Sequence, residues 1–215
     1  MHYERLKTKH REVRDQHPRS LAIRVHRALS WLNKAEQSDD LDSQFIFYWI
    51  AFNAAYAQHI DRPILMSERG KFQQFLSKLV SLDDGNQLAE FVWQEYANTI
   101  RVVLNNEFIF ESYSDAQNDA ITQDEWKQLR AKSIHASHQA LSSEQTDVVL
   151  SIVFSRLYTL RNQLLHSGAT WNGKVNRQQV ADCTAIMAKV IPLVIEVMMG
   201  HPDELWGDSI YPVIN

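Results

Sequence analysis

The stretch from Val148 to Gly168 limits most strongly how this chain can fold, because its pattern predicts one long helix. Apolar residues recur along it at spacings of three and four and therefore share one face. They are Val149, Val153, Leu157, Leu160 and Leu164. The opposite face is small or polar, with Ser151, Ser155, Thr159, Asn162 and His166. Gly168 suits a left-handed cap, so we expect the helix to end just after His166. Arg161, Asn162 and His166 then crowd the last turns of an otherwise apolar helix.

Three further segments show the helical period, and together with the first they predict long helices at about 18–37, 41–61, 143–167 and 176–199. The earliest has an apolar face of Leu21, Val25, Ala28, Leu29, Leu32 and Ala35. The second carries an aromatic stripe of Phe45, Tyr48, Trp49, Phe52, Tyr56 and Ile60, which favours a deeply packed helix. No segment has a convincing strand pattern. We therefore predict an all-α fold with one domain over 1–215. It would be a four-helix up-and-down bundle with a helical insertion at 62–142 and a non-helical tail at 200–215.

Several short patterns predict where helices begin. Asp40 can cap the helix that follows it. Thr122-x-x-Glu125 is a capping-box pattern and predicts a short polar helix, and Ser142-x-x-Gln145 predicts the start of the long helix near 143. Pro192 lies inside the last long helix and should kink or break it, because proline lacks the backbone donor.

Composition narrows the class of protein. A single cysteine, Cys183, cannot form an internal disulfide, and we expect it to be a small core residue. The start of the chain is too charged for a secretory leader. The longest apolar run, from Val190 to Met199, is too short to span a bilayer. These features predict a cytoplasmic protein that does not enter a membrane.

Charge is unevenly distributed, although the formal net charge of the chain is only −4. Residues 1–27 contain eight Lys or Arg side chains and three acids. Such an arm could contact phosphates, or it could be a solvated and partly frayed terminus.

Residues 161–166, Arg-Asn-Gln-Leu-Leu-His, are the strongest candidate site. Asn162 and His166 are four apart and lie about 40° from each other around the helix. If the leucine face enters the core, this face is bare in a single chain. Two copies could pair through it and bring two sets of Arg161, Asn162 and His166 into one cleft. Alternatively, the segment is a surface helix end where His166 interacts favourably with the helix dipole.

A second histidine pair, His135-x-x-His138, has a spacing that could place two metal ligands on one helix face. No carboxylate or third histidine lies nearby in the sequence to complete a zinc site. No phosphate-binding loop, dinucleotide motif or serine nucleophile motif is present. We therefore expect no metal.

The RNQLLH segment on the third of four predicted bundle helices resembles the HEPN superfamily, whose members carry an Arg-polar-x(3–5)-His motif on this helix. The segments LSWLNKAE, FYWIAFNAAYA, ATWNGKVNR and LWGDSIYPVIN are similar to bacterial members. The resemblance implies a metal-independent endoribonuclease without cofactor, often a toxin or phage-defence effector. Some members are non-catalytic and bind a protein partner or a nucleotide instead.

The same resemblance implies roles for individual residues. Arg161 would bind the scissile phosphate, Asn162 would orient the histidine or the phosphate, and His166 would transfer protons while an RNA 2′-hydroxyl attacks the phosphorus. Apart from the resemblance, the basic charge of residues 1–27 predicts further RNA contacts from Arg5, Lys7, Lys9 and Arg11, and Tyr158 is another candidate contact. The implied partners are RNA, a second copy of the chain through the 148–167 face, and possibly an antitoxin protein.

Overall fold

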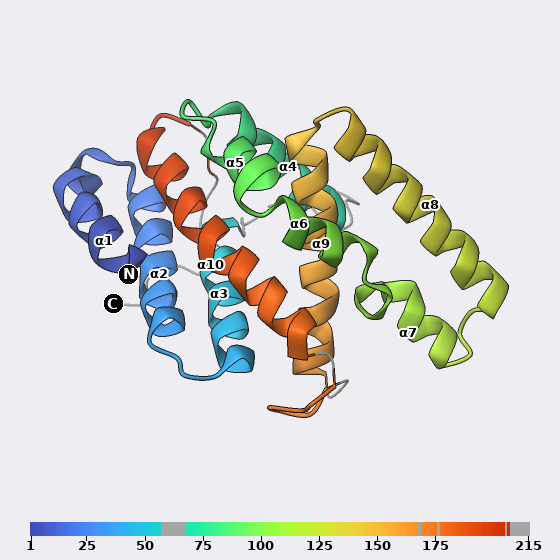
Figure 1. The fold of residues 1–215 in the computed structure, drawn as a ribbon. Helices are drawn as coiled ribbons and strands as arrows, with labels where there is room; N and C mark the ends of the chain where they lie inside the picture. Colours follow the sequence, from blue (N-terminus) through green and yellow to red (C-terminus); the bar gives the residue numbers. More distant parts are fainter. Residues whose placement is uncertain (57–67, 167–168, 176, 205, 207–215) are drawn as a thin grey trace.

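The computed structural model describes residues 1–56, 68–166, 169–175, 177–204 and 206, and within these ranges the chain is helical with no strand (Figure 1). The all-α prediction is therefore confirmed for the described residues. The α-helices are α1 (His2–Val13), α2 (Arg19–Glu36), α3 (Leu41–Tyr56), α4 (Glu68–Ser81), α5 (Gln87–Glu90), α6 (Ala97–Asn105), α7 (Glu111–Gln117), α8 (Gln123–Ser142), α9 (Thr146–Leu165) and α10 (Arg177–Gly200). Three short turns of other helix types complete the order: η1 (Arg14–Gln16), η2 (Phe91–Glu95) and η3 (Glu107–Ile109).

The four long predicted helices correspond to α2, α3, α9 and α10. Each begins or ends within three residues of its predicted boundary where that boundary is described, while 57–61 and most of the tail lie outside the described residues. The predicted apolar face of α2 is fully buried. The Asp40 carboxylate accepts the backbone N–H of Ser43 at 2.9 Å and so caps α3 as expected.

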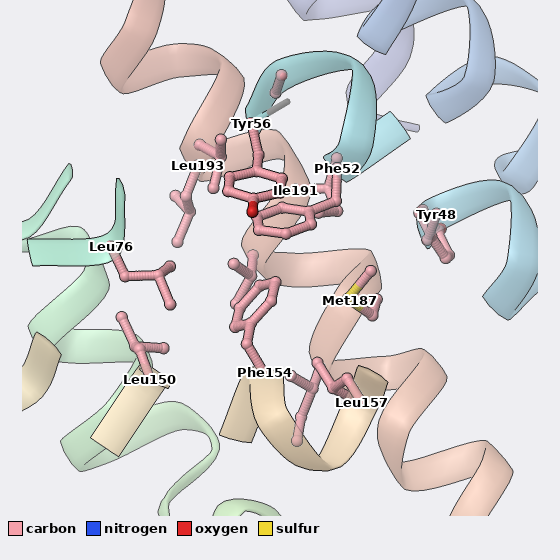
Figure 2. Packing of buried hydrophobic residues seen from close by; sticks show 14 of the residues in the cluster. Tyr48, Phe52, Tyr56, Leu76, Leu150, Phe154, Leu157, Met187, Ile191 and Leu193 are labelled. Carbon is pink, nitrogen blue, oxygen red and sulfur yellow. The ribbon is translucent and has the colours of Figure 1, made fainter. Parts of the chain in front are cut away.

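Aromatic rings from α3 and α9 form the centre of the core (Figure 2). Phe72 and Phe75 of α4 pack against the ring of Phe52. The ring of Phe52 lies 4.4 Å from that of Phe154 and stacks on Tyr56 at 5.3 Å between centroids. Met187 and Ile191 of α10 close the same cluster. Burying one such phenylalanine stabilises the fold by about 1.5–3 kcal/mol, so α9 is held in place by its apolar face.

Several inserted helices pack against α9, including α4, which belongs to the same core. α9 packs most extensively against α4, and it also contacts α6, α8 and η3. As a result Ser155 and Thr159 are only 8% and 7% exposed. The prediction that a single chain leaves this face bare is therefore wrong for these two residues, because the insertion covers them.

α8 and α9 form a helical hairpin (Figure 1). Thr122 and Glu125 make both hydrogen bonds of the predicted capping box, but α8 is a long helix of 20 residues rather than a short one. The second predicted capping box is wrong: Ser142 is the last residue of α8, and α9 begins at Thr146. The Ser-x-x-Gln spacing here joins the last residue of α8 to the residue before α9, so the pattern marks a helix end as well as a helix start.

The basic N-terminal segment is a folded helix and not a frayed terminus. Leu6 and His10 of α1 are buried against the body, at 0% and 2% exposure. The carboxylate of Glu36, at the end of α2, accepts the backbone N–H groups of His2 and Tyr3 and so caps α1. Long-range contacts therefore order a segment whose composition suggests disorder.

α10 continues through Pro192, so the predicted break does not occur. The helix is long and apolar enough to cross a membrane by length and composition, but 72% of its most apolar window is buried inside the protein. It contacts α1, α2, α3 and α6 and functions as a core helix. Cys183 is fully buried within it, as predicted.

Candidate functional site

Arg161, Asn162 and His166 lie together at the C-terminal end of α9. The helix ends at Leu165, and the backbone N–H of His166 donates to the carbonyl of Asn162 at 2.9 Å. This end point is the one that the sequence predicts. Arg161 and Asn162 are half-buried and His166 is exposed. The insertion thus covers the middle of the polar face and leaves its last turn accessible.

Arg161 and Asn162 interact directly through their side chains. Consecutive residues of a helix point about 100° apart, yet Nη1 of Arg161 donates to Oδ1 of Asn162 at 2.8 Å. The amide therefore draws the guanidinium toward the face that Asn162 shares with His166. A guanidinium has five N–H donors, and Nε of Arg161 is buried without a hydrogen-bond partner among the described residues.

The local charge favours an anion. No acidic residue occurs in the sequence between Asp147 and Asp182, whereas this interval contains the buried Arg156 as well as Arg161, Lys174 and Arg177. Arg177 is already neutralised, because its Nη1 lies 2.8 Å from both carboxylate oxygens of Asp42. An ion pair with a described carboxylate is not found for Arg161. Its charge remains available to a phosphate.

The other predicted RNA contacts lie elsewhere. α1 is on the opposite side of the molecule from α9, with α2, α3 and α10 between them (Figure 1). Arg5 donates two hydrogen bonds to Glu196 at 2.8 and 2.7 Å, and Lys9 lies 3.5 Å from the same carboxylate. Lys7 lies 3.4 Å from Nδ1 of His26, and Arg11 is exposed. Three of these four basic residues are thus engaged within the fold.

Tyr158 belongs to the aromatic core rather than to an open surface. Its ring lies 6.0 Å from that of Trp49 and 5.8 Å from that of Phe72. Its side chain is partly buried. The structure therefore gives Tyr158 a packing role, one turn of helix before the accessible end of α9.

His135 and His138 are both exposed on α8 and border a shallow groove of about 390 Å³ with Trp126, Lys127 and Arg130. No group of three or more histidine, cysteine or carboxylate side chains in the described part of the chain could hold a metal ion.

The loop after α9 contains site residues that the sequence patterns do not single out. The indole N–H of Trp171 donates to Oδ1 of Asp40 at 3.3 Å, and the backbone N–H of Asn172 donates to Asp42 at 2.8 Å. The pKa of Asp40 is lowered, first by the backbone and hydroxyl donors of Ser43 and then also by Trp171. The Asn-Gly turn signal at 172–173 was available in the sequence. The contacts of this turn with Asp40 and Asp42, more than 120 positions earlier, could not be read from the sequence.

Comparisons of the chain with protein-family models, curated proteins and solved structures find no match. The functional argument therefore depends on the residues of this end of α9.

Proposed function

We propose that the chain is a metal-independent endoribonuclease that uses Arg161, Asn162 and His166. The observation that carries the proposal is the hydrogen bond from Arg161 to Asn162 beside the exposed His166, at the one accessible end of a buried helix. The resemblance of RNQLLH to the HEPN motif supports the same roles.

The proposed chemistry needs an anion-binding group and a proton carrier. The Arg161 guanidinium binds the scissile phosphate and stabilises the negative charge that develops as the 2′-oxygen attacks phosphorus. The P–O5′ bond breaks, the 5′-oxygen takes up a proton, and a 2′,3′-cyclic phosphate remains. His166 takes the proton that the attacking 2′-hydroxyl loses and supplies the one that the 5′-oxygen gains. Imidazole suits this role at neutral pH, because it can accept and donate a proton there. Asn162 holds the guanidinium on the His166 side.

The test is cleavage of a labelled RNA in the presence of a chelator. His166→Ala should reduce the rate by about 10²–10⁴-fold, and Arg161→Ala should cripple it. Leu129→Ala is a matched control, since Leu129 is 46% exposed on α8 and belongs to no proposed site. Circular dichroism should show all variants folded. Wild-type protein that leaves every RNA intact would sink the proposal.

A second candidate is a non-catalytic module that binds a protein partner. The observation in its favour is the exposure of apolar side chains at the same end of the molecule: Leu165 at 48%, Trp171 at 69% and Val175 at 82%. Cleavage that depends on His166 would exclude this reading.

A toxin or phage-defence role follows from the proposed activity. Induced expression in bacteria should stop growth for the wild type and not for His166→Ala. An antitoxin protein would relieve the arrest by covering this end of α9. Growth that continues under wild-type expression would argue against the toxin role.

Dimerisation is part of the proposal in a narrower form than the sequence suggests. Because Ser155 and Thr159 are buried, a second copy can reach only the last turn, near Leu165 and His166. Leu165→Arg should then split the dimer in sedimentation at tens of micromolar. Ser155→Arg is unsuitable for this test, because it would force a charge into the interior.

A further inference from the structure

Residues 169–175, which lie between α9 and α10, contact the start of α3 through Trp171 and Asn172. Asp42 is only 7% exposed, and its carboxylate accepts hydrogen bonds from Arg177 and from the backbone of Asn172. Asp40 accepts the indole N–H of Trp171. The start of α3, the end of α9 and the start of α10 meet here (Figure 1). Residues 169–175 are thus anchored within their turn, and Arg177 fixes the chain again at the start of α10.

The turn itself presents Trp171 outward. The backbone N–H of Gly173 donates to the carbonyl of Thr170 at 2.9 Å, which makes Trp171 and Asn172 the two central residues of a β-turn. Asn172 has a φ of 53°, in the left-handed region that asparagine tolerates. A Cβ on Gly173 would lie 2.9 Å from the Thr170 carbonyl oxygen, so this turn requires glycine.

Among the described residues, none packs against Trp171 in a way that explains its position. Its side chain is 69% exposed, whereas Trp49 and Trp206 are 2% and 3% exposed. Its one polar atom is bonded to Asp40, which fixes the direction of the ring and leaves the apolar faces to solvent. A flat, pre-oriented indole surface is the part that proteins use to stack an unpaired nucleobase.

The charges around the loop suit a ligand that joins a neutral ring to an anion. Lys174 is exposed three residues after Trp171, and His166 is exposed five residues before it. The nearest carboxylates are on the α3 side, where Asp42 is neutralised by Arg177 and Asp40 lies beside the indole N–H. A nucleotide whose base lies over Trp171 and whose phosphates face Lys174 and Arg161 would match this separation of basic residues from carboxylates.

We propose that Trp171 is a stacking platform for an unpaired base and that Lys174 contacts a neighbouring phosphate. The substrate of the nuclease is then single-stranded RNA rather than duplex. This inference rests on the proposed function and adds its substrate class. Stacking accounts for about 1–3 kcal/mol per base in single-strand binding proteins, so loss of the ring should weaken binding about 5- to 150-fold.

The test measures binding of a fluorescent 12-nucleotide RNA, single-stranded or annealed to its complement, to the full chain carrying His166→Ala. Adding Trp171→Ala should raise the Kd for the single strand by about 5- to 150-fold and leave duplex binding unchanged. Trp171→Phe should retain most of the affinity. Lys174→Ala should flatten the dependence of binding on salt by about one phosphate contact.

Val175→Ala is the matched control, because Val175 is 82% exposed on the same loop without a flat ring. Val175→Ala should leave the Kd unchanged. The midpoint of thermal unfolding should be the same for all variants, as expected if the contact between Asp42 and Arg177 is preserved. Equal binding by Trp171→Ala, or equal weakening by Val175→Ala, would overturn the inference. If one of these two results is obtained while the wild type still cleaves RNA, the proposed nuclease activity stands and only the stacking role of Trp171 is rejected. A wild type that neither binds nor cleaves RNA overturns both, and a protein partner then becomes the occupant of Trp171.

Discussion

α1 and the last turn of α9 both carry arginine and histidine, and the fold uses them in opposite ways. In α1, Arg5 is paired with Glu196 and His10 is 2% exposed. In α9, Arg161 is bonded to a neutral amide and His166 is exposed. The fold thus supplies a carboxylate for Arg5, whereas no described carboxylate pairs with Arg161.

Two arginines on α9 offer the largest test of this difference. Arg156 is 4% exposed, lies 3.4 Å over the Phe110 ring and donates to Ser133 at 2.6 Å. Arg156→Ala should lower the free energy of unfolding by about 3 kcal/mol, because it removes a buried charged hydrogen bond and leaves a cavity. Arg161→Ala should lower it by less than about 1 kcal/mol. Urea denaturation measures both, and similar losses would erase the distinction.

His10 gives the next largest effect, through pH. Burial, reinforced by the charge of Lys7, lowers the pKa of His10 from 6.5 to about 4, although the Ala22 carbonyl opposes this. The folded state therefore favours the neutral ring. The free energy of unfolding has its full value above pH 6.5. It falls as the pH drops toward 4, because the unfolded chain binds a proton at this histidine that the folded chain does not bind. The loss reaches up to about 3 kcal/mol.

The measurement for His10 is the free energy of unfolding at pH 7 and at pH 5, for the wild type and for His10→Leu. The variant should show a flatter pH dependence, with the remainder due to His17 and His26, whose pKa values burial also lowers. An unchanged pH slope in His10→Leu would mean that α1 is not held through this histidine.

The smallest effect concerns the ion pair of α1. The pKa of Glu196 is lowered chiefly by its hydrogen bonds from Arg5, so its contribution is present above pH 4.5 and is lost as the pH falls below that value. Since Arg5 is half exposed, Glu196→Gln should cost less than about 1 kcal/mol at pH 7. The charge swap Arg5→Glu with Glu196→Arg should restore the thermal midpoint. If RNA affinity falls in the swapped protein, α1 also contacts RNA.

The sequence predicts local features of this fold well and distant pairings poorly. The 3.6-residue periodicity locates the four long helices because each buries one continuous face. Arg161, Asn162 and His166 are correctly placed at a helix end, since Gly168 and the loss of apolar residues mark that end. The cover over Ser155 and Thr159 depends on where the insertion packs, which no local pattern records. The contacts of Glu36 and Glu196 with α1, and of Asp42 with Arg177, join residues 33 to 191 positions apart.

The clamp between Asp42 and Arg177 also bears on the order of events during synthesis. Asp42 leaves the ribosome early, and α4 to α8 follow before α9 is made. The contact of Asp42 with this loop can therefore form only after Arg177 has been made. A nascent chain shorter than this has the arginine and histidine of the motif but not the fixed loop beside them.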